Sequence, residues 1–431
     1  MIDLLKRLYP LRLAPVSEDS DKAVDILCNE LPFTVHEYKS GAEHNGWTVP
    51  RKWKPAKAEI RKGGRLIYDG MRHPLGVAGY STSFKGTISL DELRKHLFYN
   101  PNIHDALVYH CDYFYKPWLR DWGLSVPYNL YNSLEEGDYE IDIQTVFEDG
   151  TMKVLDYLLE GEREDTIILN AHNCHAAQAN DDISGVVAAI ETIKRLRARG
   201  RRRYSYRVVI APEHLGTVFY LANLPANTGK TFKYAMFLEM LGNENRFALQ
   251  ESFTGESLID RAAHHYLRHK FPDYHSDKFR KIVGNDETVW EAPGYEIPCI
   301  SLSRWPYQEY HSSMDNEYII SEKRLEEAAE TVIGIVDILE TDTSIKRHFN
   351  GLIALSNPEY DLYISTFDPS IRNSVPDEQK RWNHLMNCLT RYFDGKTTIL
   401  DTAIKHDLEY SRLYKYIEKY KSKGLISFAN G

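Results

Sequence analysis

Short apolar runs alternate with amphipathic segments through the middle of the chain. The apolar runs are TIILNAH (166–172), YRVVIAP (206–212), YAMFLEML (234–241) and CISLSR (299–304). Segments with helical spacing of apolar residues occupy 184–197, the stretch from 216 onwards and 321–340. Apolar strands that alternate with helices are typical of a buried, mostly parallel sheet with helices on both faces, so we predict an α/β fold of this kind.

The first third of the chain has a different pattern. Residues 1–31 have a helical rhythm that is interrupted at Pro10 and Pro15. From about 33 to 131, short alternating segments lie between Gly and Pro residues, which predicts antiparallel strands and hence an inserted β-rich domain. Residues 139–161 then predict a hairpin with its turn at Asp149-Gly150.

The last eighty-odd residues predict a separate module. A stretch rich in Gly, Asn-Pro and Asp-Pro follows residue 346, and 377–431 have the pattern of three helices and a possible small strand pair, an order that resembles a winged helix-turn-helix. The predicted organisation is a main domain of 1–32 and 132–346, an inserted domain of 33–131, a linker of 347–376 and a winged-helix-like domain of 377–431.

Composition narrows the class of protein. The chain has 431 residues with 42% hydrophobic content, enough for a sizeable core, and its net charge of -9 gives no electrostatic case for nucleic acid as the main partner. Charged residues and prolines interrupt the N-terminal leucines, so the sequence predicts neither a signal peptide nor a membrane span, and we expect a cytoplasmic protein. Five scattered cysteines argue against a disulfide framework or a Cys-X-X-Cys zinc site.

Metal-type ligands follow the predicted strands one after another. His172, His175, Asp181 and Asp182 follow the first, Glu213-His214 the second, Glu239 lies near the end of the third, and His311 follows the last. Such strand ends share one crevice in α/β sheets. Imidazole and carboxylate ligands suit zinc, and two zinc ions can share a bridging carboxylate. A carboxylate that is not a ligand must then move the proton of the attacking water, and Glu213 is placed for that role.

The motifs AHNCHAAQANDDISG, PEHLG, FLEMLG, GNDE and YHSSMDN resemble, in this order, those of the two-zinc exopeptidases of the bacterial leucyl aminopeptidase and glutamate carboxypeptidase type. The resemblance covers about 132–345. With the inserted and terminal domains, the layout resembles a subgroup of aminopeptidase-like proteins that carries a winged-helix tail and is often associated with bacterial polysaccharide biosynthesis. Fold kinship alone does not fix a substrate.

The resemblance implies a set of roles. His172 and Glu239 would hold one zinc ion, His214 and His311 the other, Asp181 would bridge them, and Glu213 would be the general base. Three positions depart from the family pattern: Cys174 stands where an acid orients the first His, His214 stands for an acidic ligand, and Glu239 stands for Asp. The neutral His214 leaves open whether one or two zinc ions bind. Asp182 is expected to orient the loop or to cap the next helix, and His175 to lie beside the ligands or merely in the loop.

Substrate recognition is less specific in the sequence. An aminopeptidase needs carboxylates for the substrate amine, and Asp286 and Glu287 could supply them. Arg304 could bind a carboxylate or form a structural ion pair, and Tyr307 or Tyr310 could donate to an oxyanion or pack at the rim.

We therefore expect a zinc metallo-exopeptidase, an aminopeptidase-like hydrolase in which metal-activated water attacks the carbonyl of a peptide or small amide. One alternative is a zinc amidase or deacylase acting on an amino-sugar or cell-envelope precursor. Another is a DNA-binding regulator whose hydrolase-like domain senses a ligand. Residues 377–431 hold ten Lys or Arg against seven Asp or Glu, so nucleic-acid binding is possible but not favoured, and a homo-oligomer is possible.

Overall fold

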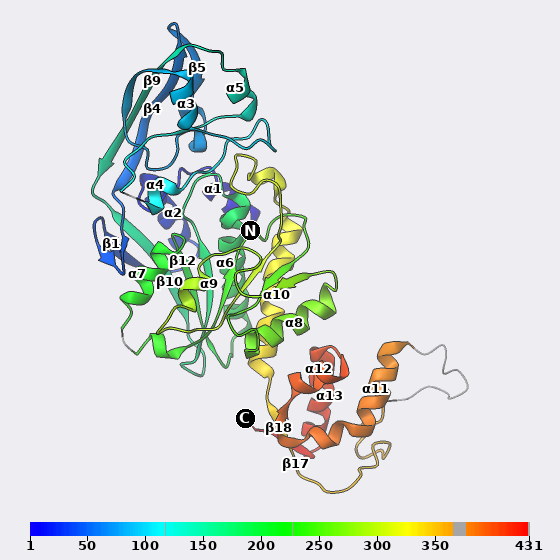
Figure 1. Ribbon diagram of the computed structural model, residues 1–431. Helices are drawn as coiled ribbons and strands as arrows, with labels where there is room; N and C mark the ends of the chain where they lie inside the picture. Colours follow the sequence, from blue (N-terminus) through cyan, green and yellow to red (C-terminus); the bar gives the residue numbers. More distant parts are fainter. Residues whose placement is uncertain (117, 226, 365–375, 430–431) are drawn as a thin grey trace. The chain divides into compact units, whose positions relative to one another are not determined.

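The computed structural model describes residues 1–116, 118–225, 227–364 and 376–429 (Figure 1). The chain forms two compact units, Met1–Gly255 with His275–Glu330, and Glu256–Tyr274 with Thr331–Gly431. The domain boundaries predicted from the sequence stay predictions, and residues 365–375 of the predicted linker lie outside the described residues. Among the described residues, no helix combines the length and apolarity needed to cross a membrane.

An eight-stranded mixed sheet forms the centre of the first unit, in the order β1-β10-β12-β11-β13-β16-β14-β15. The four middle strands, β12, β11, β13 and β16, are parallel, as the alternating pattern predicted, whereas β1, β10 and β14 join them in antiparallel pairs. The sheet is therefore mixed. Its strands are β1 (Thr34–Lys39), β10 (Thr151–Leu159), β11 (Thr166–His172), β12 (Ser205–Ala211), β13 (Phe232–Leu238), β14 (Ala248–Gln250), β15 (His275–Asp277) and β16 (Cys299–Ser303).

Helices flank this sheet because its middle strands are mostly buried. Tyr220 of α7 (Leu215–Ala222) and Trp290 of α9 (Glu287–Trp290) pack with Ile168 and Val209 in one apolar cluster. Helix α6 (Gly185–Arg199) begins with Gly185, where a Cβ would meet the Leu238 carbonyl oxygen at 2.0 Å, so the helix can approach the sheet closely only with glycine here. This close packing fixes the loop between β11 and α6.

A four-stranded antiparallel sheet in the order β5-β4-β9-β6 lies in the same unit. Its strands are β4 (Lys52–Lys62), β5 (Arg65–Asp69), β6 (Phe84–Ser89) and β9 (Asp138–Glu148). The predicted hairpin at 139–161 is wrong in its pairing, because β9 joins this sheet while β10 joins the large one. Conversely, β1 lies in the predicted inserted range but pairs with β10.

The first part of the chain also contains α1 (Ile2–Leu8), α2 (Glu18–Cys28), β2 (Glu43–His44), β3 (Trp47–Thr48), α3 (Leu90–Lys95), β7 (Leu97–Phe98), α4 (Asp112–Tyr115), β8 (Leu124–Ser125) and α5 (Tyr128–Ser133).

The second unit is mainly helical. It contains α8 (Leu258–Lys270), the end of α10 (Glu322–Thr341), α11 (Asp377–Cys388), α12 (Ile399–His406) and α13 (Tyr410–Ser422). A three-stranded antiparallel sheet, β18-β17-β19, accompanies them, with β17 (Ser344–Arg347), β18 (Asp394–Thr398) and β19 (Ile426–Phe428). The helices of 377–431 lie where the pattern predicts them, and the assignment of this region as a winged helix stays a prediction.

Candidate metal centre

The loop that follows β11 brings the first candidate ligands to the carboxyl edge of the sheet. His172 ends the strand and is 1% exposed. Its backbone N–H donates to Oδ2 of Asp182 at 3.1 Å, and Oδ1 of Asp182 accepts from the N–H groups of Gly185 and Met240, both at 3.2 Å. Asp182 thus joins the strand, the start of α6 and the end of β13, as expected for a residue that orients this loop.

Asp181 is the point where several imidazoles meet. Its Oδ1 lies 3.4 Å from Nε2 of His172, and its Oδ2 lies 3.6 Å from Nε2 of His175 and 3.2 Å from Nε2 of His311. Ligand atoms of His175, Asp181 and His311 all lie within 4.8 Å of one another. Residues from the first and the last motif therefore converge on one carboxylate. Asp181 and His311 are 130 positions apart in the chain.

The polar atoms in this cluster fit a bound cation. Nε2 of His172, Nε2 of His175 and Oδ2 of Asp181 are buried and have no hydrogen-bond partner of adequate geometry. Burial alone would raise the pKa of Asp181, but the nearby imidazoles of His172, His175 and His311 hold it well below its usual range. Buried polar atoms are normally satisfied, and carboxylate oxygen with imidazole nitrogen is a zinc-binding set, so zinc fits these residues.

Asp315 holds the backbone that presents Asp181. Its Oδ1 accepts from the N–H of Asn180 at 2.6 Å, and its Oδ2 accepts from the N–H of Asp181 at 3.1 Å and from the Tyr307 hydroxyl at 2.7 Å. Burial raises the pKa of Asp315 to about 7. Asp315 belongs to the motif YHSSMDN, but nothing in the sequence predicted its contact with the loop of Asp181. The Tyr307 hydroxyl, one of two candidates for a hydrogen bond to the oxyanion, donates its hydrogen bond to Asp315.

Glu213 and His214 follow β12. The Tyr115 hydroxyl donates to Oε2 of Glu213 at 3.1 Å, and Oε1 lies 3.5 Å from Nδ1 of His214. Nε2 of His214 lies 3.1 Å from the carbonyl oxygen of Asn285. His214 has a φ of 51°, and Met240 and His311 have φ of 52°, a left-handed conformation that costs free energy for such residues and that clusters at functional sites.

Glu239 lies just past β13 and is fully buried. Its Oε1 accepts from the Ser301 hydroxyl, and its Oε2 accepts from Nδ2 of Asn285 at 2.5 Å. Burial, with the nearby charge of Glu287, raises the pKa of Glu239 well above its usual value. Asn285 therefore contacts both Glu239 and His214. Its place in the GNDE motif did not predict these contacts.

Cys174 contacts His172 in place of the acid that the resemblance implies. Its Sγ lies 3.5 Å from Nδ1 of His172 and 4.0 Å from Oε2 of Glu213. Burial raises the pKa of the Cys174 thiol. The thiol thus connects a predicted ligand to the predicted base.

The residues predicted to bind substrate make contacts within the protein. Asp286 is buried and accepts from the His214 N–H and the Thr217 hydroxyl, both at 2.5 Å. Glu287 is buried and accepts from Gln250 and from the Asn285 N–H. Arg304 is 2% exposed, donates to Glu327 at 2.8 Å and lies 3.8 Å from the Phe247 ring centroid. Tyr310 stacks on His311 with centroids 3.8 Å apart. Their assignment to substrate binding stays a prediction.

Aromatic residues from the range 33–131 form a wall beside the cluster. Tyr109 stacks on His175 with ring centroids 4.1 Å apart, and its N–H donates to the His311 carbonyl oxygen at 2.8 Å. Trp47 lies 6.1 Å from the His214 ring. A small cavity of about 40 Å³ reaches Cys174 and His175 and is also lined by Tyr109, Cys111 and Phe114.

Comparison with known proteins agrees with this geometry. A family model described as "Domain of unknown function (DUF4910)" matches residues 2–342. The chain belongs to the DUF4910 family. It is 27% identical over 414 residues to a protein of Clostridium acetobutylicum that is named for polysaccharide biosynthesis and an aminopeptidase-like domain, covering 95% of this chain and 92% of the relative.

Solved structures extend the comparison. A crystal structure from Clostridium acetobutylicum, described as that of a "putative peptidase", aligns with a TM-score of 0.82 and 25% identity over 99% of this chain and 95% of that one. A zinc aminopeptidase from Bacillus subtilis aligns with a TM-score of 0.60 and 12% identity over 78% of this chain and 93% of that one. This DUF4910 chain therefore has the fold of the zinc aminopeptidases, with a large mixed sheet flanked by helices.

Proposed function

We propose that this chain is a zinc-dependent hydrolase of the aminopeptidase-like type that cleaves an amide bond with Glu213 as general base. The observation that carries the proposal is the convergence of three imidazoles on the buried Asp181, with Nε2 of His172, Nε2 of His175 and Oδ2 of Asp181 unpartnered. The fold, which is that of the zinc aminopeptidases, and the imidazole and carboxylate ligands both support zinc-dependent hydrolysis.

The two oxygens of Asp181 face different partners, which supports a bridging role. Oδ1 faces His172, and Oδ2 faces His175 and His311. His172 and Glu239 would hold one zinc ion, and His175 and His311 would hold the other, with Asp181 contributing to both. His175 then takes the position that the resemblance gave to His214, whose Nε2 faces the Asn285 carbonyl.

Zinc, when bound, would supply positive charge that polarises the substrate carbonyl and lowers the pKa of a water molecule. Glu213 then takes the proton from water at a carboxylate oxygen and delivers it to the leaving amine. The Tyr115 hydroxyl fixes the orientation of this carboxylate by donating to its Oε2. Burial, with the charge of Glu213, raises the pKa of Tyr115, so this hydroxyl keeps its proton at neutral pH. Cys174 keeps the ring of His172 in place through its contact with Nδ1.

Replacement of the base separates catalysis from metal binding. Glu213→Gln keeps the shape and the contact with Tyr115 but cannot accept a proton, so turnover of aminoacyl anilides by the zinc-loaded protein is expected to fall 10²- to 10⁴-fold. Metal content, measured by elemental analysis, is expected to stay unchanged. Glu160→Gln, a substitution of a surface glutamate, is the control. Full activity of Glu213→Gln would remove Glu213 from the role of base.

An amidase acting on an N-acylated amino sugar is a second candidate. Asp286 and Glu287 are buried and hydrogen-bonded within the protein, so this loop offers no free carboxylate for a substrate amine. The similar protein of Clostridium acetobutylicum is named for polysaccharide biosynthesis. Parallel assays with aminoacyl anilides and N-acyl amino sugars decide between the two: hydrolysis of the sugars alone favours the amidase, and hydrolysis of the anilides alone favours the aminopeptidase.

A further inference from the structure

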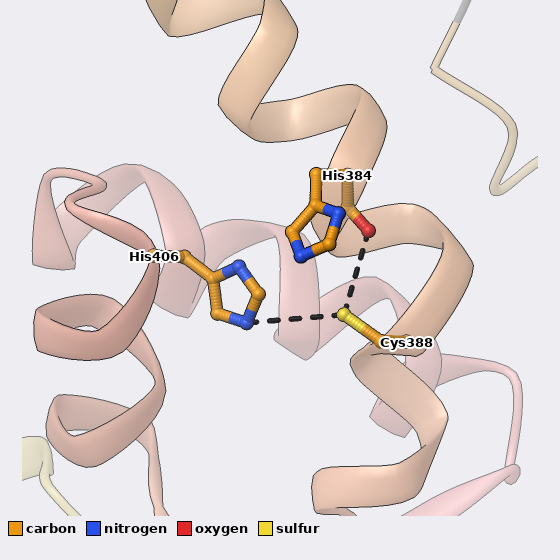
Figure 2. Close-up of side chains that lie close together, drawn as sticks. All are labelled: His384, Cys388 and His406. Carbon is orange, nitrogen blue, oxygen red and sulfur yellow. Dashed lines mark hydrogen bonds between the residues drawn. The ribbon is translucent and has the colours of Figure 1, made fainter.

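A second group of metal-type ligands lies in the C-terminal unit, between α11 and α12. It consists of His384, Cys388 and His406, whose ligand atoms all lie within 4.8 Å of one another (Figure 2). His384 and Cys388 are four residues apart on α11, so both side chains lie on one face of that helix. His406 is the last residue of α12.

Local structure fixes where His406 lies. Helix α12 begins with a capping box in which the Thr398 side chain and the Asp401 side chain each accept from the other's backbone N–H. Asp407, the C-cap residue that follows the helix, has a φ of 49°. His406 is 8% exposed, and its imidazole lies 5.4 Å from that of His384, centroid to centroid. The start and the end of α12 are therefore both defined, and the imidazole of His406 is held beside α11.

The distances suit a tetrahedral ion. Sγ of Cys388 lies 3.8 Å from Nε2 of His406. Two ligands at ordinary zinc–sulfur and zinc–nitrogen distances, with a tetrahedral angle between them, are about 3.5 Å apart. A shift of a few tenths of an ångström in one side chain would therefore bring both atoms into range. Because His384 is exposed and Cys388 is partly exposed, the group is open to an ion from solvent.

The chemistry of the donors selects the ion. One thiolate and two imidazoles form a soft set that favours zinc over magnesium or calcium. Nε2 of His406 lies 3.0 Å from the Tyr392 hydroxyl, and the Cys388 thiol donates to the His384 carbonyl oxygen at 3.4 Å.

We propose that His384, Cys388 and His406 form a zinc site that joins α11 to α12, with a fourth position open to solvent. Binding of Zn²⁺ releases one proton from the Cys388 thiol, forms one zinc–sulfur and two zinc–nitrogen bonds, and replaces the hydrogen bond between His406 and Tyr392. This site, the His384 cluster, shares no residue with the Asp181 cluster, which consists of His172, His175, Asp181 and His311. It does not depend on the proposed hydrolase function.

The test uses the full chain and Co²⁺ as a spectroscopic probe for zinc. Titration of the metal-free protein with Co²⁺ is expected to give a sulfur-to-cobalt charge-transfer band that zinc abolishes. Cys388→Ser is expected to lose the band and one bound ion per chain, whereas Cys174→Ser, which alters the thiol beside His172, is expected to keep the band. Absence of the band in the unaltered protein, its persistence in Cys388→Ser, or its loss in Cys174→Ser would overturn the proposal.

A second variant guards against misfolding. His384→Ala removes an exposed ring, so folding is expected to be unaffected, while the affinity of this site for Zn²⁺ is expected to fall at least tenfold. His348→Ala, which also removes an exposed imidazole from the same unit, is the matched control and is expected to change nothing. Equal zinc affinity in the two folded variants would contradict the assignment.

Discussion

The Asp181 cluster and the His384 cluster are both groups of metal-type ligands, but they are built differently. The first lies at the carboxyl ends of buried parallel strands, is itself buried except for the partly exposed His311, and combines imidazoles with a carboxylate. The second lies between two helices, is partly exposed and combines imidazoles with a thiol. A buried, charged centre is suited to catalysis, whereas a small site between two helices is suited to stabilisation.

The first test of this comparison concerns the residue on which the strand-end cluster depends. Asp181→Asn keeps the size of the side chain but removes the charge that faces three imidazoles. We expect the loss of zinc from this cluster and a fall in hydrolytic activity of about 10³-fold or more, since the charge and the bridging ligand are lost together. Elemental analysis and anilide hydrolysis measure both.

Asp149→Asn is the control for this charge change, because Asp149 has a side chain that is 90% exposed. The zinc content assigned to the His384 cluster is expected to survive in Asp181→Asn. Unchanged zinc content and activity in Asp181→Asn would show that the cluster is not the metal centre.

The second test asks which histidine completes the Oδ2 side of the cluster. His175→Ala is expected to lower the zinc content by up to one ion per chain, because its Nε2 lies 3.6 Å from Asp181. His214→Ala is expected to keep that ion, because Nε2 of His214 faces the Asn285 carbonyl. Elemental analysis of the two variants compares them directly. The reverse result would restore the ligand set that the family resemblance implied.

The third test concerns the acid sensitivity of the C-terminal unit, to which the His384 cluster belongs. Burial, with the charges of His269 and Arg268, lowers the pKa of His265 to about 4. Between pH 6.5 and about 4, the unfolded chain binds a proton that the folded chain does not, so stability is lost as pH falls through this window. Across this window, the imidazole of His265 is expected to lower the free energy of unfolding by about 3 kcal/mol.

His265→Gln is expected to reduce this acid sensitivity, measured by urea unfolding at pH 7 and pH 4. His264→Gln, at the neighbouring partly buried position on α8, is the control. An unchanged pH dependence in His265→Gln would mean that the imidazole is not the group that titrates.

The central strands and the place of the site could be predicted from the sequence because both depend on local patterns. The runs that form β11, β12, β13 and β16 are mostly apolar, and each is followed by a ligand-type residue. The predicted convergence of His172, Asp181 and His311 on one point agrees with their distances. The supporting contacts could not be predicted, because Asp315 binds the N–H of Asn180 across 135 positions.

Pairing was harder to predict than strand position. A turn at Asp149-Gly150 indicated a hairpin, but the two strands that it joins lie in different sheets, since only long-range packing decides the partner of each. The His384 cluster was missed for a related reason. His384 and Cys388 are four residues apart on one helix, a spacing that is visible in the sequence. His406 lies on another helix, and the sequence does not show that the two helices bring these side chains together.

Crystallography with anomalous scattering at the zinc edge would show directly whether zinc binds at Asp181. In crystals of zinc-loaded protein, we expect an anomalous peak within bonding distance of Asp181 and of Nε2 of His172 or His311. Zinc-loaded crystals that show no peak at this cluster, with the imidazoles pointing away from Asp181, would contradict it.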